Sequence, residues 1–175
     1  KNTTTGEEYT ESYDKLILSP GAEPFKPNIA GIDSERVMTL RNIPDTYKIK
    51  DYVDQKKPKS AVVVGGGYIG IEMAENLYDA GLEVTIVELA PHVIAGLDYD
   101  MACDVHNHIV SKGVNLILND GVQAIKEDNA GLTVTLKSVE LETDLVIMAV
   151  GVRPDSKLAK EAGLEAHPKG GIIVN

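Results

Sequence analysis

The chain has 175 residues, a formal net charge of −10 and a hydrophobic content of 43%. An acidic chain lacks the basic surface that nucleic acids and anionic membranes attract, so neither is expected as a partner. No apolar run reaches the ~18–20 residues that a membrane-spanning helix needs. The single cysteine, Cys103, excludes an internal disulfide and a CxxC metal or redox pair, which fits a reducing cytoplasm.

The first third of the chain has few regular patterns. Residues 13–18 predict a strand of a hairpin, ended by a turn at residues 19–22. A stretch marked by prolines follows and predicts a connector. Residues 43–53 predict a helix, because Pro44 would stand in its first turn, where a missing N–H costs little.

The middle of the chain alternates regularly between strand and helix patterns. Residues 61–64 form a short, wholly apolar run that is typical of a buried parallel strand. Residues 68–80 have apolar side chains at helical spacing, and Gly81 provides a stop signal. Residues 84–87 are a second β-branched run. Together they predict a βαβ unit.

The second half continues this pattern and then changes period. Residues 98–112 predict a helix with acidic residues in its first turn, and residues 115–118 predict a third strand. Short strands with antiparallel character are then predicted at residues 122–126, 132–136 and 139–141, followed by a buried strand at residues 145–150. The expected fold is α/β, with a central parallel sheet, helices and a three-stranded antiparallel meander.

A glycine motif joins the first strand of the βαβ unit to its helix. Gly65 would make the tight turn, Gly67 would let the backbone approach a pyrophosphate, and Gly70 would let the helix pack closely. The N-terminus of the helix offers free N–H groups and a positive dipole end to phosphates. The sequence therefore predicts a Rossmann-like dinucleotide site; the alternative is a purely structural glycine turn.

Glu88 ends the second strand of this unit, where a carboxylate accepts hydrogen bonds from the ribose hydroxyls. The same carboxylate would repel a 2′-phosphate, and no arginine follows in residues 89–92, so NAD(H) is favoured over NADP(H). FAD uses the same glycine pattern. An FAD motif usually opens a chain, however, and here the motif lies in the middle, so NAD(H) is the better interpretation.

Three segments resemble a known family in order and spacing: residues 13–24, 65–72 and 149–154. The chain is similar to the pyridine nucleotide-disulfide oxidoreductases, flavoproteins with two dinucleotide sites. The serine-proline-glycine-alanine turn and residues 67–72 look most like the branch of coenzyme A-disulfide reductases, NADH oxidases and NADH peroxidases. Residues 87–94, with residues 97–102 after them, look closest to coenzyme A-disulfide reductases. The resemblance implies a Rossmann-like FAD/NAD(P)-binding fold.

The resemblance also implies how the chain is divided. Residues 1–30 would be a remnant of flanking FAD-domain strands with a connector, residues 31–152 the NAD(H)-binding domain, and residues 153–175 a return segment toward the FAD domain. The start without methionine and the end inside a strand-like run favour a piece of a longer protein. The family's FAD motif, its redox cysteine and its dimerisation domain would lie outside this piece, and Cys103 does not match that cysteine.

The resemblance assigns roles near the nicotinamide. Tyr68 would lie beside it, Glu72 would face its amide group, and the backbone of Gly151 would approach it. The alternatives are a surface tyrosine, a glutamate favoured by the helix dipole, and a turn glycine. The expected NAD(H) contacts are Gly65, Gly66, Gly67, Tyr68, Ile69, Gly70, Glu72, Glu88, Leu89 and Gly151; no catalytic residue and no metal ligand is expected in the chain.

The expected function follows from these inferences. The chain would be the NAD(H)-binding domain of a flavin-dependent reductase that delivers hydride from NADH to FAD and reduces coenzyme A disulfide or persulfide. Its partners would be NADH and the FAD domain of the same parent chain, and the parent would be a homodimer. The alternatives are a domain of an NADH oxidase or peroxidase, and a non-catalytic NAD(H)-binding module that senses redox state.

Overall fold

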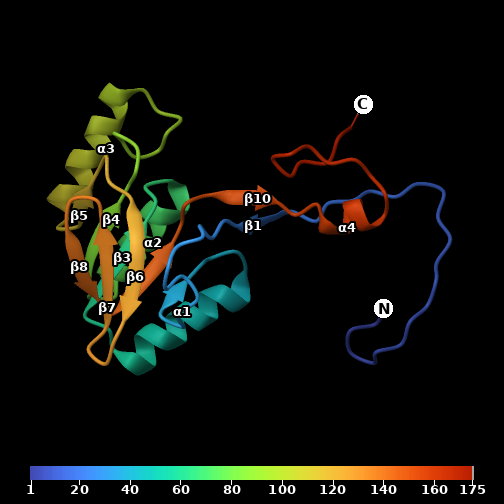
Figure 1. Ribbon diagram of the computed structural model, residues 1–175, viewed down its shortest axis with the longest axis horizontal. Coiled ribbons are helices and arrows are strands. Elements are labelled where there is room, and N and C mark those ends of the chain that lie inside the picture. Colours follow the sequence, from blue (N-terminus) through green and yellow to red (C-terminus); the bar gives the residue numbers. More distant parts are fainter. Residues whose placement is uncertain (175) are drawn as a thin grey trace. The chain divides into compact units, whose positions relative to one another are not determined.

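The computed structural model describes residues 1–174, so the last residue of the strand-like run at the C-terminus lies outside the described part. The chain divides into two compact units. The smaller contains residues 1–22 and the segment from Pro154 onward, and the larger spans residues 23–153. All the elements that form the dinucleotide motif lie in the larger unit (Figure 1).

The larger unit is built on a five-stranded parallel sheet. Its strand order is β2 (Val37–Met38), β9 (Leu145–Met148), β3 (Ser60–Val64), β4 (Glu83–Val87) and β5 (Asn115–Ile117). The side chains of β9 are all buried, as are those of β3 after Ser60. Apolar side chains on both faces are what a parallel sheet covered on both sides requires.

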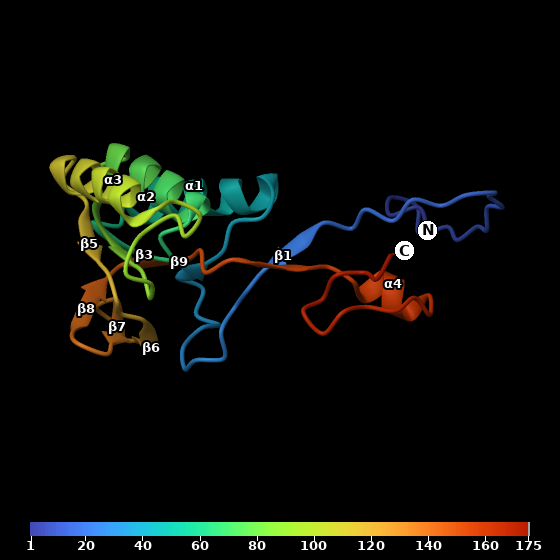
Figure 2. The same cartoon turned by 90° about the horizontal axis from the view of Figure 1, so that it is seen from above.

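Three helices cover one face of this sheet, α1 (Ile43–Lys56), α2 (Tyr68–Asp79) and α3 (Tyr99–Ser111) (Figure 2). Successive residues of β3 point to opposite faces, so Ala61 and Val63 pack in the helix-side core, whereas their neighbours pack in a second core on the other side. The predicted helices are confirmed to within three residues at their ends.

An antiparallel meander covers the opposite face. It consists of β6 (Val122–Glu127), β7 (Leu132–Leu136) and β8 (Glu140–Thr143). Alternate side chains of β7 are buried against the parallel sheet, which is the period-2 pattern of a sheet with one covered face. The predicted α/β fold with a three-stranded meander is confirmed.

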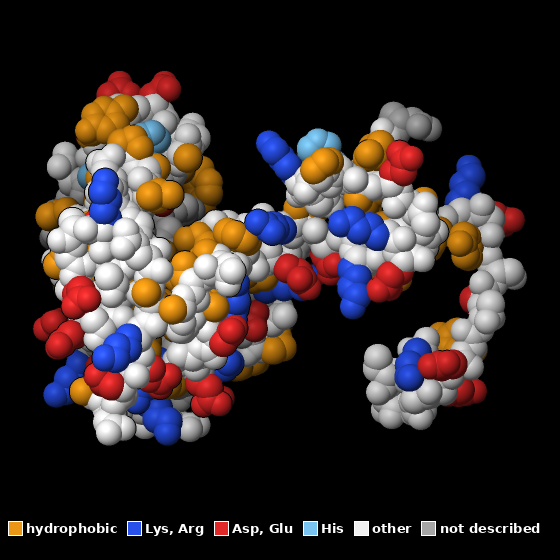
Figure 3. Space-filling view, in the orientation of Figure 1, with side chains coloured by type: hydrophobic (Ala, Val, Ile, Leu, Met, Phe, Trp, Pro, Cys, Tyr) orange, Lys and Arg blue, Asp and Glu red, His pale blue; other side chains and the backbone are white. Residues whose placement is uncertain are grey.

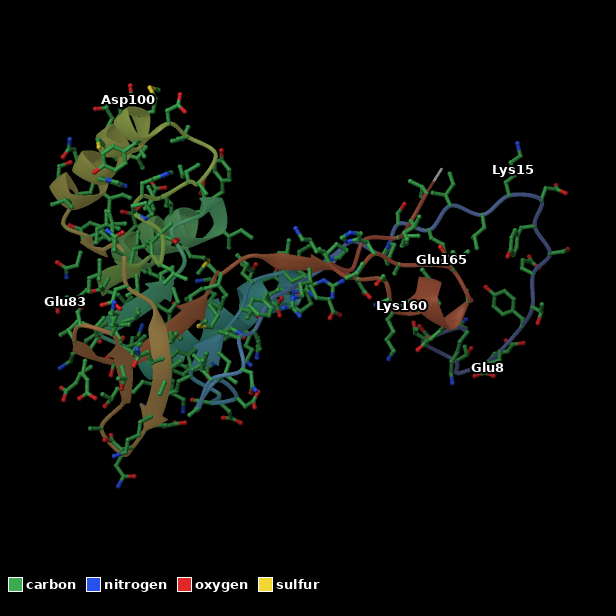
Figure 4. All side chains as sticks on the ribbon, turned by 45° about the horizontal axis from the view of Figure 1, so that its top comes forward. Glu8, Lys15, Glu83, Asp100, Lys160 and Glu165 are labelled. Atoms are coloured by element: carbon green, nitrogen blue, oxygen red, sulfur yellow. The ribbon has the colours of Figure 1, made fainter. Side chains whose placement is uncertain are left out.

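The helix ends differ in how they are capped. At α1, Asn42 and Asp45 form a reciprocal capping box, with Pro44 at the second position. At α3, Asp100 lies in the first turn, where its charge complements the helix dipole (Figure 4). At α2, the N-cap is Gly67, which offers no side chain to the free N–H groups.

The prediction for the N-terminal segment was wrong. Residues 13–18 form no strand, and Tyr13 and Ile17 are exposed. The local sequence was not sufficient, because a strand also needs a partner, and no described segment pairs with these residues. The first strand is β1 (Ala22–Pro24), which pairs with β10 (Val152–Pro154). The structure also contains a short helix, α4 (Lys157–Glu161), which the sequence did not predict.

A buried carboxylate, Asp120, joins the end of β5 to the turn between β7 and β8. Its Oδ1 accepts hydrogen bonds from the backbone N–H groups of Gly121, at 2.8 Å, and Lys137, at 2.9 Å. Its Oδ2 accepts from the backbone N–H of Ser138, at 3.1 Å, and from the hydroxyl of that serine. The Ser138 hydroxyl, together with the backbone donors, lowers the pKa of Asp120 below its ordinary value.

We predict that Asp120→Asn lowers the free energy of unfolding, because an amide cannot accept from all four donors. The lowered pKa means that the folded chain binds this proton less readily than the unfolded chain. The stabilisation is therefore complete above the ordinary pKa of about 3.9 and is lost as pH falls through the pKa of the folded state. Urea denaturation at several pH values should show a difference from wild type that shrinks in acid.

The matched control is Asp104→Asn on the exposed surface of α3, for which little change is expected at any pH. An equal effect of the two substitutions, or a difference from wild type that does not depend on pH, would contradict this role for Asp120.

Candidate functional site

The glycine loop leaves no room for side chains at two of its three motif positions. Gly65 has φ of +110°, and a Cβ there would overlap the carbonyl oxygen of Ala149. A Cβ on Gly70 would overlap the carbonyl oxygen of Gly65, so close helix packing requires glycine there. Gly67 is different, because a Cβ on it would meet nothing within 4 Å. The loop is therefore tightly packed at Gly65 and Gly70, whereas the space next to Gly67 is open.

The open side of the loop coincides with the start of α2. Gly67 is the N-cap, and the first hydrogen bond of the helix runs from the N–H of Ile71 to the carbonyl oxygen of Gly67 at 3.0 Å. The N–H groups of Tyr68, Ile69 and Gly70 have no acceptor inside the helix, and no side chain caps them. Free N–H groups at the positive end of a helix dipole suit a phosphate anion.

Glu88 lies at the carboxyl end of β4, and each oxygen of its carboxylate accepts a hydrogen bond from a backbone N–H. Its Oε2 accepts a hydrogen bond from the N–H of Gly66 at 2.6 Å, and its Oε1 accepts from the N–H of Ala90 at 2.7 Å. Each oxygen can accept a further hydrogen bond. Glu88 therefore fixes the glycine loop and still has acceptor capacity for a ligand.

The loop that follows β4, residues 88–97, also holds the glycine loop through its second half. The N–H of Ile94 donates to the carbonyl oxygen of Gly66 at 2.8 Å. A Cβ on Gly66 would lie 2.7 Å from Cγ1 of Val93, so that side chain closes over the glycine. Both polar groups of the Gly66 backbone are thus bonded to the 88–97 loop.

These segments border a cavity of about 900 Å³ at the carboxyl edge of the parallel sheet. Ligands of open α/β sheets bind at this edge, where loops from several strands converge. Eight of the ten predicted contacts line the cavity: Gly65, Gly66, Gly67, Tyr68, Ile69, Glu88, Leu89 and Gly151. Gly70 is buried beneath the glycine loop, and Glu72 is exposed on α2 outside the lining.

Two large apolar side chains of the cavity lining are strongly exposed. Tyr68, the first residue of α2, has 72% of its surface exposed, and Leu89 has 75%. Both lie on the cavity lining, and large apolar side chains left this exposed are suited to packing against a ligand. Leu89 also contacts Gly121, where a Cβ would lie 3.0 Å from Cδ1 of the leucine.

The sequence did not single out two other parts of the lining. Phe25 is part of the lining, and its N–H donates to the Gly151 carbonyl oxygen at 2.9 Å. The guanidinium of Arg153 lies 4.0 Å from the centre of the Phe25 ring. Asp120 and Lys137 line the cavity beyond β5. Their contacts join residues far apart in the sequence, so no local pattern indicated them.

Other kinds of site receive no support from residues 1–174. These residues contain no group of three or more His, Cys, Asp or Glu side chains placed to hold a metal ion, and no helix among them is long and apolar enough to cross a bilayer. Acidic and basic side chains are interspersed on the face shown in Figure 3. The dinucleotide-type cavity is the site with the clearest chemistry.

Comparisons with known proteins support the same assignment. A coenzyme A disulfide reductase of Staphylococcus haemolyticus is 38% identical over 175 residues, which cover 99% of this chain and 38% of that protein. The crystal structure of reduced CoADR-RHD from Bacillus anthracis matches with a TM-score of 0.93 and 52% identity, covering 100% of this chain and 31% of that one. This chain therefore spans less than two fifths of the length of either relative.

A water-forming NADH oxidase from Lactobacillus brevis, solved with NADH bound, matches with a TM-score of 0.85 and 34% identity over 98% of this chain and 38% of that one. The family model of the pyridine nucleotide-disulphide oxidoreductases matches residues 1–175. Because that match spans the whole chain and agrees with the fold and the glycine loop, the protein belongs to the pyridine nucleotide-disulphide oxidoreductase family.

Proposed function

We propose that the chain is the NAD(H)-binding part of a flavin-dependent disulfide reductase. The observation that supports this most directly is the cavity of about 900 Å³, whose lining includes the glycine loop, Glu88 and Gly151. Bound NADH supplies a hydride, and FAD in the parent protein is its acceptor. The residues of this chain bind and orient the nucleotide.

The geometry fits a dinucleotide in three respects. The space above Gly67 is open, so a pyrophosphate can approach the free N–H groups at the start of α2. Glu88 retains acceptor capacity for the hydroxyls of the adenosine ribose. Leu89 and Tyr68 offer exposed apolar surface on which the adenine and the nicotinamide can pack.

The remaining predicted contacts have narrower roles. Gly65, Gly66, Ile69 and Gly70 shape the loop around the pyrophosphate, and the backbone of Gly151 borders the nicotinamide end. Glu72 lies outside the lining. It therefore reaches the nicotinamide amide only if that group extends one turn along α2.

The acceptor that we propose is coenzyme A disulfide or persulfide, because a coenzyme A disulfide reductase is among the relatives that match nearly the whole chain. The likeness to the Lactobacillus brevis enzyme favours a second candidate, an NADH oxidase. In both cases the parent would hold FAD in a separate domain and form a homodimer. The lone Cys103, which forms no disulfide, fits a cytoplasmic protein.

The proposed function is tested by combining binding with turnover. We expect the 175-residue chain to bind NADH, detected by intrinsic tyrosine quenching and a rise in the unfolding temperature. It should not oxidise NADH in the presence of coenzyme A disulfide, because the flavin acceptor is held by the parent. The full-length parent should oxidise NADH with coenzyme A disulfide; rapid oxidation with oxygen alone would favour the oxidase.

Two variants control this experiment. Gly67→Ala places a methyl group in the open space above the loop and should weaken NADH binding roughly tenfold or more, about 1.4 kcal/mol. Gly96→Ala, also in open space but outside the cavity lining, should bind NADH as wild type does. Disulfide reduction by the isolated chain, or a parent that binds NADH without any turnover, would contradict the proposal.

The preference for NADH over NADPH is predicted to depend on the charge of Glu88. Glu88→Arg replaces a carboxylate that repels a 2′-phosphate with a cation that attracts it. The ratio of the NADPH and NADH dissociation constants, measured by titration, should fall at least tenfold. The ratio is the informative quantity, because the substitution also removes the hydrogen bonds to Gly66 and Ala90 and so weakens the binding of both nucleotides. An unchanged ratio would rule out this role for Glu88.

A further inference from the structure

The 88–97 loop is also held by a residue of α3. The ring nitrogen Nε2 of His106 accepts a hydrogen bond from the backbone N–H of Val93 at 3.2 Å. Val93 has no exposed surface and packs in the same core as Ile109 of α3. The imidazole thus provides a polar partner for a backbone group that the core would otherwise leave without one.

This hydrogen bond is directly connected to the glycine loop. Val93 closes over Gly66 with its side chain, and the next residue, Ile94, donates its N–H to the carbonyl oxygen of Gly66 at 2.8 Å. Ile94 has φ of +48°, a conformation that a β-branched residue rarely adopts. Such a conformation persists only where the neighbouring contacts enforce it. The hydrogen bond to His106 is one of those contacts.

We propose that His106 is a positioning residue of the nucleotide site. It fixes the backbone of Val93 and Ile94 and, through them, holds Gly66 in the geometry that receives the pyrophosphate. His106 does not line the cavity, so it acts through the loop and not on the ligand. The effect on NADH rests on the proposed function, whereas the effect on the loop does not.

The role requires an unprotonated Nε2, because an imidazolium has only donors. Burial, and then the neighbouring His92, lower the pKa of His106 below its ordinary value. On α3 itself the neighbours one turn away are Ala102, Cys103, Ile109 and Val110, none of which has a carboxylate or an ammonium group. On the loop, Glu88 is engaged by two backbone N–H groups.

The direction of the pH dependence follows from this. Above the ordinary histidine pKa of about 6.5 the acceptor is fully available. As pH falls through the lower pKa of His106 in the folded chain, the imidazole becomes cationic and the bond to Val93 is lost. The affinity for NADH should therefore decrease in acid.

The test uses two substitutions of His106 in the 175-residue chain. His106→Phe keeps a ring but removes the acceptor, and His106→Gln keeps an acceptor that does not titrate. The matched controls are His108→Phe and His108→Gln, at an exposed histidine on the same helix. The measurements are NADH titration from pH 5 to pH 8 and hydrogen exchange of the Gly66 and Ile94 amides without nucleotide.

We expect His106→Phe to weaken NADH binding roughly tenfold at pH 8, the scale of one lost hydrogen bond, and to speed exchange of the Ile94 and Gly66 amides. His106→Gln should keep most of the NADH affinity at pH 8. Its affinity should decrease in acid much less than that of wild type, because the glutamine does not titrate. The His108 variants should follow wild type in both measurements.

The outcomes separate this proposal from the proposed function. If wild type binds NADH and His106→Phe binds it equally well, His106 does not position the loop. If wild type does not bind NADH, the proposed function fails, and the amide exchange still decides the role of His106. If His106→Phe does not fold, His106→Gln decides, because an acid dependence equal to that of wild type would contradict the proposal.

Discussion

The site depends on the backbone of one residue, Gly66, being bonded on both sides to the 88–97 loop. Its N–H donates to Glu88 and its carbonyl oxygen accepts from Ile94. The glycine loop, which we propose contacts the pyrophosphate, and the 88–97 loop, whose Glu88 we propose contacts the ribose, are therefore one hydrogen-bonded unit. Because the glycine loop and the 88–97 loop are already positioned before a nucleotide binds, little conformational entropy is lost on ordering them. The carboxylate of Glu88 therefore has a structural role in the absence of a ligand, because it fixes the glycine loop.

That unit is supported by the three layers of the fold. Parallel strands bring their carboxyl ends to one edge, so the loops after β3, β4, β5 and β9 converge on one cavity. The helices and the meander cover the two faces of the sheet (Figure 2), and the cavity lies at its carboxyl edge. Asp120 then joins the end of β5 to the turn between β7 and β8, so the meander also forms part of the cavity rim.

Much of this could be predicted because the signals are local. The glycine loop, the helix that follows it and Glu88 lie within one βαβ unit, and the burial of β3 follows from its apolar run. Asp120 and His106 could not be predicted, because their roles depend on partners 13 to 18 residues away that only folding brings close. The strand predicted at residues 13–18 is absent for the converse reason: the local sequence favours a strand, but no described segment pairs with it.

The role of the glycine loop is tested most directly by a nitrogen-15 amide spectrum of the chain titrated with NADH. We predict that the largest shifts fall on Tyr68 and Ile69, because the pyrophosphate approaches the free N–H groups at the start of α2. ADP-ribose should reproduce these shifts, since it contains the same pyrophosphate and ribose. NADH and ADP-ribose should also shift the amide of Glu88, whereas nicotinamide mononucleotide, which lacks the adenosine ribose, should not. If saturation with NADH left the glycine-loop amides unchanged, this loop would not be the nucleotide site.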